Sequence, residues 1–191
     1  MNIAVLGGSF APPHIGHSLV VKQIQSLRPD IDKILLVPSF RHQWKPIQGS
    51  AQDRLAMLDC FTDKRVELSD MEIKRKRGEY TIDTIRELKK RIDATFYFIV
   101  GSDIIYEFDR WKKTEELVSL TTFLVFPRDP YHVPKKIPKG FELIDDKNLI
   151  TTNLSSTIIR DRIKNGQSIK YLVPEEVEKY IINTNYTNKL T

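Results

Sequence analysis

Short, largely apolar runs punctuate the chain, and glycine, proline or polar residues end most of them. Runs of roughly four to eight apolar residues bounded by turn residues are typical of strands buried on both faces of a sheet. None approaches the roughly 20 residues needed to cross a bilayer. The pattern predicts strands at 2–6, 33–37, 65–73, 95–100, 122–126 and 141–144.

Helical spacing fills the intervals between these runs. Ile82, Ile85, Leu88 and Ile92 recur on one face and predict an amphipathic helix. Pro174 suits the first turn of a final helix. The pattern predicts helices at 16–28, from 51 onward, and at 80–92, 114–120, 155–164 and 174–182, with a polar loop at 39–50.

Strands that alternate with helices predict one α/β domain around a parallel sheet with right-handed crossovers. A length of 191 residues suits a single domain. We expect a core of about 1–150, followed by a C-terminal helical part of about 151–191. Because such sheets bind ligands beyond the carboxyl ends of their strands, the chemistry is expected in the loops after Leu6, Val37, Val100 and Phe126.

The composition predicts a cytoplasmic protein but does not identify its partner. Cys60 is the only cysteine, so no intrachain disulfide can form and a reducing compartment fits best. The first residues lack the charged leader and long apolar stretch of a signal peptide. We therefore expect a cytoplasmic protein with no membrane partner, and the sequence leaves the oligomeric state open.

The net charge of +5 and the pI near 9.2 leave two kinds of partner open. A basic protein can bind nucleic acid, or it can hold small polyanions. The densest basic run, Lys74 to Arg77, is short and is followed by Gly78-Glu79, which favours a solvated loop. We therefore expect small-molecule substrates and no nucleic acid.

The loop after the first strand has the residues of a phosphate-binding site. It reads Gly7-Gly8-Ser9-Phe10-Ala11-Pro12-Pro13-His14-Ile15-Gly16-His17. Glycines let the backbone approach a ligand closely, and the N-terminus of the following helix attracts anions. His14 and His17 are three residues apart, so they share one helix face and can donate hydrogen bonds to phosphate oxygens.

A second helix start offers a matching set of donors. Ser155, Ser156 and Thr157 place hydroxyl groups at its N-terminus, and Arg160 follows about one turn later. A serine at this position commonly caps its helix. The set also suits a pyrophosphate, because arginine can bind two phosphate oxygens at once.

These two segments resemble the signatures of the nucleotidyltransferase superfamily. His14 to His17 matches HxGH, and the segment from Leu154 to Arg160 is similar to ISSTxxR. Within the superfamily, the chain looks most like bacterial nicotinate-nucleotide adenylyltransferases. Further matches are Arg54–Leu58 (R..ML), Tyr80–Thr84 (YTIDT), Gly101-Ser102-Asp103 with Trp111, and Tyr171–Pro174, so the resemblance covers nearly the whole chain in order.

The resemblance implies a Rossmann-like, doubly wound parallel sheet with a small C-terminal helical subdomain that carries the second signature. It also implies an enzyme of NAD biosynthesis that joins nicotinate mononucleotide to the AMP part of ATP and releases pyrophosphate. Mg²⁺ would arrive with ATP, held mainly by phosphates and water, with no metal site built by the protein.

The resemblance also implies roles for particular residues. The catalytic residues would be His14, His17 and Arg160. ATP would be bound by Gly7, Gly8, Ser9, Phe10, Gly101, Asp103, Arg128, Ser155 and Ser156. The acceptor, a pyridine mononucleotide, would be bound by Lys45, Thr81, Asp103, Trp111 and Lys112, with Trp111 stacked on the pyridine ring.

Two segments depart from the family pattern. Ala11 stands where the family usually has Asp or Asn, so one side-chain hydrogen bond is missing. The family's PPHK-like segment reads His42-Gln43-Trp44-Lys45, in which Lys45 keeps the basic position but Trp44 replaces a histidine. His42 either compensates for that histidine or is an exposed loop residue.

Other functions remain open at this stage. The same chemistry could act on nicotinamide mononucleotide, phosphopantetheine or another phosphate acceptor. A nucleotide-binding module without turnover is a second alternative, although the intact His14, His17, Ser155 and Arg160 argue against it. HxGH also occurs in class I aminoacyl-tRNA synthetases, but the chain has no KMSKS-like loop and no room for a tRNA-binding domain.

Overall fold

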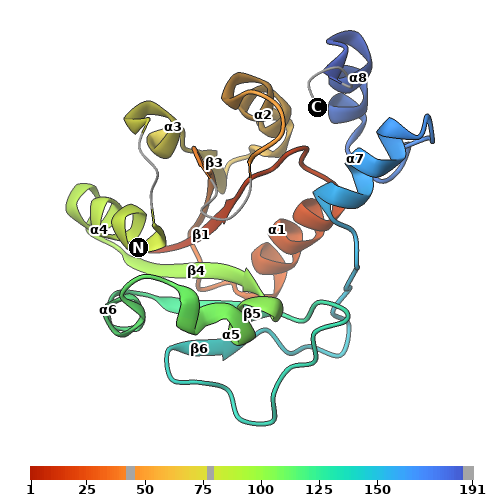
Figure 1. The fold of residues 1–191 in the computed structure, drawn as a ribbon. Helices are drawn as coiled ribbons and strands as arrows, with labels where there is room; N and C mark the ends of the chain where they lie inside the picture. The colour runs from red at the N-terminus through yellow and green to blue at the C-terminus, as the bar shows by residue number, and fades with distance from the viewer. Residues whose placement is uncertain (42–45, 77–79, 187–191) are drawn as a thin grey trace.

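A six-stranded parallel sheet forms the centre of the molecule (Figure 1). The computed structural model describes residues 1–41, 46–76 and 80–186. The strands pair in the order β3-β2-β1-β4-β5-β6, and every neighbouring pair is parallel. They are β1 (Asn2–Gly8), β2 (Lys33–Pro38), β3 (Val66–Leu68), β4 (Thr95–Gly101), β5 (Thr122–Phe126) and β6 (Phe141–Leu143). The predicted α/β parallel sheet is confirmed.

The strand order reverses between β1 and β4. From β1 the chain first adds β2 and β3 on one side, and then returns to add β4, β5 and β6 on the other. In doubly wound sheets this reversal opens a crevice at the carboxyl ends of the two central strands. Here β1 ends in Gly7 and Gly8, and β4 ends in Gly101, so both strands enter the crevice without side chains.

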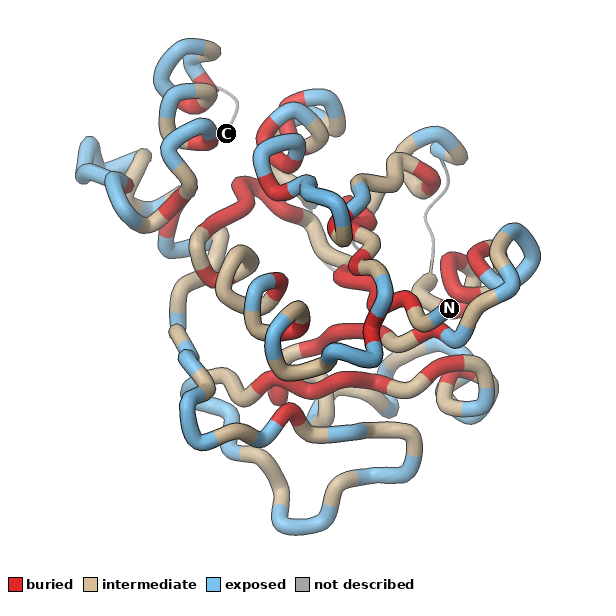
Figure 2. Tube along the Cα trace, turned by 180° about the vertical axis from the view of Figure 1, so that it is seen from behind, coloured by how far each residue is buried: buried red, intermediate tan, exposed pale blue. Residues whose placement is uncertain are grey.

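Each face of the sheet has its own core. Side chains alternate along a strand, so Ala4 and Leu6 face one layer of helices while Ile3 and Val5 face the other. Figure 2 shows the buried residues running along these central strands. The first face is covered by α1 (Ile15–Leu27), α2 (Ala51–Leu58), α7 (Ser156–Lys164) and α8 (Glu175–Asn183); the second by α3 (Met71–Arg75), α4 (Thr81–Arg91), α5 (Asp103–Glu107) and α6 (Thr114–Leu120).

The two C-terminal helices share the core of the sheet. Ile159 of α7 and Val177 of α8 are buried in the same cluster as Leu6 and Ile24. The Tyr180 hydroxyl of α8 donates a hydrogen bond to Oδ1 of Asp53 at 2.8 Å. The C-terminal helices are thus held against α1 and α2, at the end of the sheet where the crevice opens. Within the described ranges, no helix is long and apolar enough to cross a membrane.

Two short helices differ from the sequence prediction. The strand predicted at 65–73 is wrong in extent, because β3 ends at Leu68 and α3 begins at Met71. The Lys74 amide donates to the Asp70 carbonyl, and their side chains pair at 3.0 Å, which is a helical (i, i+4) interaction. Helix α5 was not predicted, because five residues are too few for a helical period to show.

Candidate active site

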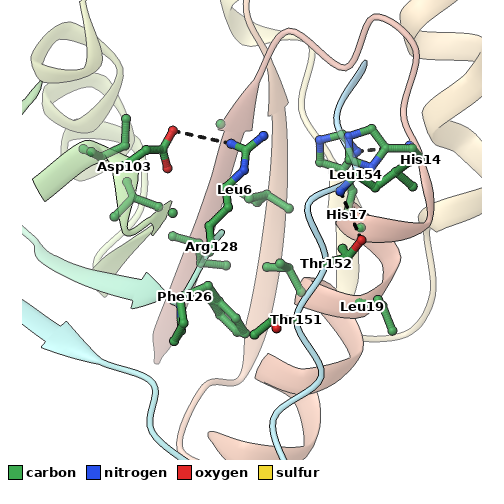
Figure 3. A pocket seen from close by; sticks show the side chains of 18 of the residues that line it. Leu6, His14, His17, Leu19, Asp103, Phe126, Arg128, Thr151, Thr152 and Leu154 are labelled. Atoms are coloured by element: carbon green, nitrogen blue, oxygen red, sulfur yellow. Dashed lines mark hydrogen bonds and ion pairs between the residues drawn. The ribbon is translucent and has the colours of Figure 1, made fainter. Parts of the chain in front are cut away.

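Two adjoining cavities open at the carboxyl ends of β1 and β4. Their volumes are about 750 Å³ and about 290 Å³, the scale of small-molecule sites. The smaller cavity lies between α1, β4, β5 and the segment at 150–154 (Figure 3). The side chains shared by both cavities are His14, His17, Phe98, Asp103, Ile104, Trp111 and Arg128.

The loop after β1 is tightly constrained. A Cβ atom on Gly7 would lie 2.9 Å from Cζ of Phe98, so only glycine fits there without a shift of that ring. Phe10 is buried and has a φ of 48°, in the left-handed region that non-glycine residues adopt at a cost in energy. Its ring centroid lies 4.8 Å from that of His17. The strained loop therefore packs directly against one of the two histidines.

The two imidazoles lie together at the start of α1. Their ring centroids are 3.8 Å apart, and His14 is the N-cap residue of the helix. The backbone amide of His14 donates a hydrogen bond to Nδ1 of His17 at 3.1 Å. Because Nδ1 accepts, the neutral His17 ring carries its proton on Nε2, which is then the atom that can donate to a ligand.

Both histidines are neutral at pH 7. Burial, together with the nearby Arg128 cation, lowers the pKa of His14 to about 4. Burial also holds the pKa of His17 well below its usual value, with smaller contributions from His14 and Arg128. The pair therefore presents hydrogen-bond donors rather than fixed positive charges until an anion binds.

The start of α7 is bonded directly to the loop after β1. The Ser156 hydroxyl donates to the Pro12 carbonyl at 2.8 Å, and Nη1 of Arg160 donates to the Ala11 carbonyl at 2.8 Å. Ser155 caps the helix by accepting a hydrogen bond from the Ile158 amide. Since the Ala11 contact uses the backbone carbonyl, it does not need the Asp or Asn side chain of the family pattern. The two predicted helix starts thus converge on one cavity wall.

Asp103 and Arg128 form the opposite corner. Nη1 of Arg128 lies 3.4 Å from Oδ2 of Asp103, and Figure 3 shows this pair across the cavity from His14 and His17. The other oxygen, Oδ1, is buried and has no hydrogen-bond partner among the described residues. It lies so close to Gly101 that a Cβ atom there would be 2.3 Å away. This corner therefore offers a carboxylate oxygen that can accept a hydrogen bond from a ligand hydroxyl.

Aromatic residues build the far end of the larger cavity. The half-buried Trp111 ring packs edge-on against Phe98 and Phe123, with centroids 6.4 and 6.0 Å apart. Nζ of Lys112 lies 4.2 Å from the centre of the Tyr80 ring, a cation–π contact at the start of α4. This end can stack on a flat ring and attract a negative charge.

The structure brings the described candidates to these two cavities. Lys45, together with His42 and Trp44, lies outside the described residues. Gly101 lines the smaller cavity. The candidates that line the larger one are Gly7, Gly8, Ser9, Phe10, His14, His17, Thr81, Asp103, Trp111, Lys112, Arg128, Ser155, Ser156 and Arg160.

Several wall residues were not predicted. Arg41, Glu72, Glu107 and Arg110 line the larger cavity, and Thr151 and Thr152 line the smaller one. They belong to no recognisable motif, and single charged or hydroxyl residues in loops and short helices carry no periodic signal. Only the fold shows that they face the crevice.

Comparisons with known proteins show similarity to nucleotidyltransferases, as the geometry of the two cavities also suggests. Residues 5–162 match the family model described as cytidylyltransferase-like. The chain is 35% identical over 184 residues to a probable nicotinate-nucleotide adenylyltransferase of Oceanobacillus iheyensis, covering 94% of this chain and 93% of that protein. It is 36% identical over 186 residues to a protein of the same description from Halalkalibacterium halodurans, covering 94% and 88%.

Solved structures show the same relationship. The Plasmodium falciparum nicotinic acid mononucleotide adenylyltransferase complexed with NaAD superposes with a TM-score of 0.84 at 26% identity, over 98% of each chain. The same enzyme complexed with APC gives a TM-score of 0.80 at 25% identity. Motifs, fold and relatives agree that the chain belongs to the cytidylyltransferase-like family and, within it, to the nicotinate-nucleotide adenylyltransferases.

Proposed function

We propose that this site joins the 5′-phosphate of nicotinate mononucleotide to the α-phosphorus of ATP, giving nicotinate adenine dinucleotide and pyrophosphate. The observation that carries the proposal is the convergence of two helix starts on one cavity, one with His14 and His17 and the other with Ser155, Ser156 and Arg160. The relatives' names and the neighbour complexed with NaAD support this choice of acceptor.

The reaction needs no protein nucleophile. The acceptor phosphate is already an anion, so one of its oxygens forms the new bond to the α-phosphorus. The bond from that phosphorus to the bridging oxygen breaks, and pyrophosphate leaves with the electron pair. The protein must hold two mutually repelling polyanions in line and stabilise the charge that develops between them.

The donors have separate tasks in this scheme. Nε2–H of His17 donates to an α-phosphate oxygen, and His14 positions the phosphates beside it. Ser155, Ser156 and Arg160 hold the β- and γ-phosphates that depart together. The backbone of Gly7, Gly8, Ser9 and Phe10 approaches the phosphates closely, and Gly101 with Asp103 and Arg128 holds the ATP ribose side.

ATP would enter as its Mg²⁺ complex. Mg²⁺ prefers oxygen ligands and usually keeps several waters. Among residues 1–41, 46–76 and 80–186, no three His, Cys, Asp or Glu side chains gather into a metal-binding group. The proposal leaves the ion on phosphate oxygens and water, where it would neutralise the triphosphate charge.

The acceptor would occupy the aromatic end of the larger cavity. Trp111 would stack on the pyridine ring, and the backbone amides of Thr81 and Lys112 would meet the nicotinate carboxylate. Lys45 would approach the acceptor phosphate. We place this single-domain enzyme in the cytoplasm, where ATP is supplied and where its one cysteine, the unpaired Cys60, stays reduced.

A panel of acceptors tests the proposal. Pyrophosphate release is measured with Mg²⁺-ATP and, separately, nicotinate mononucleotide, nicotinamide mononucleotide or phosphopantetheine. We expect the highest kcat/KM with nicotinate mononucleotide and a product with the mass of nicotinate adenine dinucleotide. If only phosphopantetheine is turned over, nicotinate mononucleotide is not the acceptor. If the protein binds ATP tightly but turns over no acceptor, the proposal that it is an enzyme is refuted.

A further inference from the structure

Arg54 is a buried arginine beside the site that the reaction scheme does not use. It lies in α2 and is only 2% exposed. Its Nη1 atom donates hydrogen bonds to two backbone carbonyls, those of Ser9 at 2.9 Å and Ser39 at 2.7 Å. Among the described residues, no carboxylate lies within ion-pairing distance of it. The guanidinium thus hydrogen-bonds main chain, and the Glu72 carboxylate acts on it only from a distance.

The two carbonyls belong to neighbouring loops. Ser9 follows the last residue of β1, and Ser39 follows the last residue of β2. The two strands pair up to Gly8 and Pro38, and the Ser39 amide donates to the Gly8 carbonyl at 2.8 Å. Both loops therefore leave the sheet side by side, and one nitrogen atom bridges them just beyond the last paired residues.

In the proposed function, the loop after β1 binds ATP, and the loop after β2, which carries Lys45, binds the acceptor. Ser9 precedes Phe10, whose strained backbone places its ring 4.8 Å from the His17 imidazole on the ATP side. The other loop begins at Ser39 and contributes Arg41 and residues 46–48 to the wall of the larger cavity. Arg54 is thus bonded to the first residue of both substrate loops.

A purely structural role does not require a guanidinium at this position. Burying a positive charge is unfavourable, and an apolar side chain of similar volume often stabilises a protein as well or better. An apolar side chain could fill the space, but it could not bond two carbonyls at once. What the arginine adds is a fixed spacing between the two loops.

We infer that Arg54 is a positioning residue that couples the binding of ATP to the binding of the acceptor. The inference rests on the proposed function. One donor contacts both carbonyls, so a shift of the Ser39 backbone on acceptor binding also shifts Ser9, and through Phe10 the His17 ring. Such coupling is reciprocal and is typically 5–150-fold. We expect each substrate to strengthen the binding of the other about 10-fold.

Titration calorimetry tests the coupling directly. The Kd of nicotinate mononucleotide is measured with and without α,β-methylene ATP, a probe that cannot transfer its AMP part. In Arg54→Lys, a single ammonium replaces the planar guanidinium, so we expect the coupling to fall to about 1–2-fold while the Kd of the probe alone changes little. If that variant does not fold, Arg54→Gln keeps one amide donor without a buried charge and is measured instead.

A second carbonyl-bridging arginine provides the matched control. Arg65 donates to the carbonyls of Gln25 and Ile31 at the opposite, amino-terminal end of the sheet. Arg65→Lys should lose stability but keep the full coupling. Equal coupling in wild type and Arg54→Lys, or no coupling in wild type, would overturn the inference. A wild-type enzyme that does not use nicotinate mononucleotide would instead overturn the proposed function.

Discussion

The ATP end and the acceptor end of the site are built in different ways. At the ATP end, donors from α7 reach carbonyls of the loop after β1, across separations of 144 and 149 residues. These bonds are directional, and they join segments that the fold must bring together. The ATP end is thus held together mainly by hydrogen bonds.

The acceptor end is held instead by ring packing. Trp111 is positioned by Phe98, Phe108 and Phe123, and Lys112 rests on the Tyr80 ring. Such contacts depend on area and charge more than on angle. This difference fits the proposed reaction. In-line displacement at the α-phosphorus requires strict alignment of the reacting atoms, whereas binding of the pyridine ring requires only a flat aromatic side chain to stack on. Changes at the ATP end should therefore alter turnover, and changes at the acceptor end should alter binding.

The largest effect is expected from His17→Ala. Removing one donor aimed at the developing charge typically costs about 2.7–4 kcal/mol of transition-state stabilisation. We expect kcat to fall by about 100-fold or more, with folding and the KM of the acceptor little changed. Steady-state kinetics with both substrates measures this. His132→Ala, in the loop after β5, is the control and should match wild type; near-wild-type turnover of His17→Ala would remove the assignment.

A second effect of the ATP end is on acid stability. The pKa of His14 is about 4 in the folded protein, against an ordinary value near 6.5 in the unfolded chain. Between these two pH values, His14 is protonated in the unfolded chain but neutral in the folded protein. The free energy of unfolding therefore falls as the pH falls from 6.5 to 4. Loss of this contribution costs on the order of 3 kcal/mol across that pH range.

His14→Asn removes this contribution and should lose less stability in acid than wild type. Urea unfolding of both proteins at pH 7.5, 5.5 and 4.5 measures the difference between their free energies of unfolding. The contributions of the carboxylates that both proteins share cancel in this difference. Lys112→Met, at the acceptor end, should follow the wild-type pH dependence. Parallel curves for His14→Asn and wild type would show that the ring is not held neutral by burial.

Trp111→Ala tests the acceptor end. Stacking of a base on an aromatic ring is worth about 1–3 kcal/mol by alanine substitution. We expect the KM of nicotinate mononucleotide to rise about 10-fold or more, while the KM of ATP stays near wild type. Trp111→Phe should recover most of the loss. A lower melting temperature with an unchanged acceptor KM would mean that the ring only packs against Phe98 and its neighbours.

The sequence predicts the strands and the two motifs of the site, but it does not predict the contacts between segments that are far apart in the chain. The central strands are mainly apolar, and each of the two signatures lies at the start of one helix, so local pattern suffices to find them. The bond from Arg160 to the Ala11 carbonyl, by contrast, depends on which strand pairs with which. Wall residues such as Glu72 and Arg41 come from segments whose direction only the fold decides. Family and fold were therefore predictable, and the hydrogen bonds that join distant loops were not.

The smallest effect concerns the acid or amide form of the acceptor, which the motifs alone leave open. In the proposed function, backbone amides meet the pyridine carboxylate, but the structure also places the Lys112 ammonium over Tyr80 on the same wall. Among the described residues, it has no carboxylate partner. An unpaired positive charge should favour the nicotinate anion over the neutral amide, and exposure to solvent limits the gain to about 0.2–1 kcal/mol.

Lys112→Met should therefore lower the ratio of kcat/KM for nicotinate mononucleotide over nicotinamide mononucleotide by about 2–5-fold, a loss that shrinks in high salt. The neighbouring Lys113 is the matched control, because its ammonium already pairs with Glu116 at 3.5 Å and it is absent from the cavity wall. Lys113→Met should keep the wild-type ratio. If both variants keep it, acid selectivity comes from the backbone amides alone, and the acceptor end discriminates by geometry, as the ATP end does.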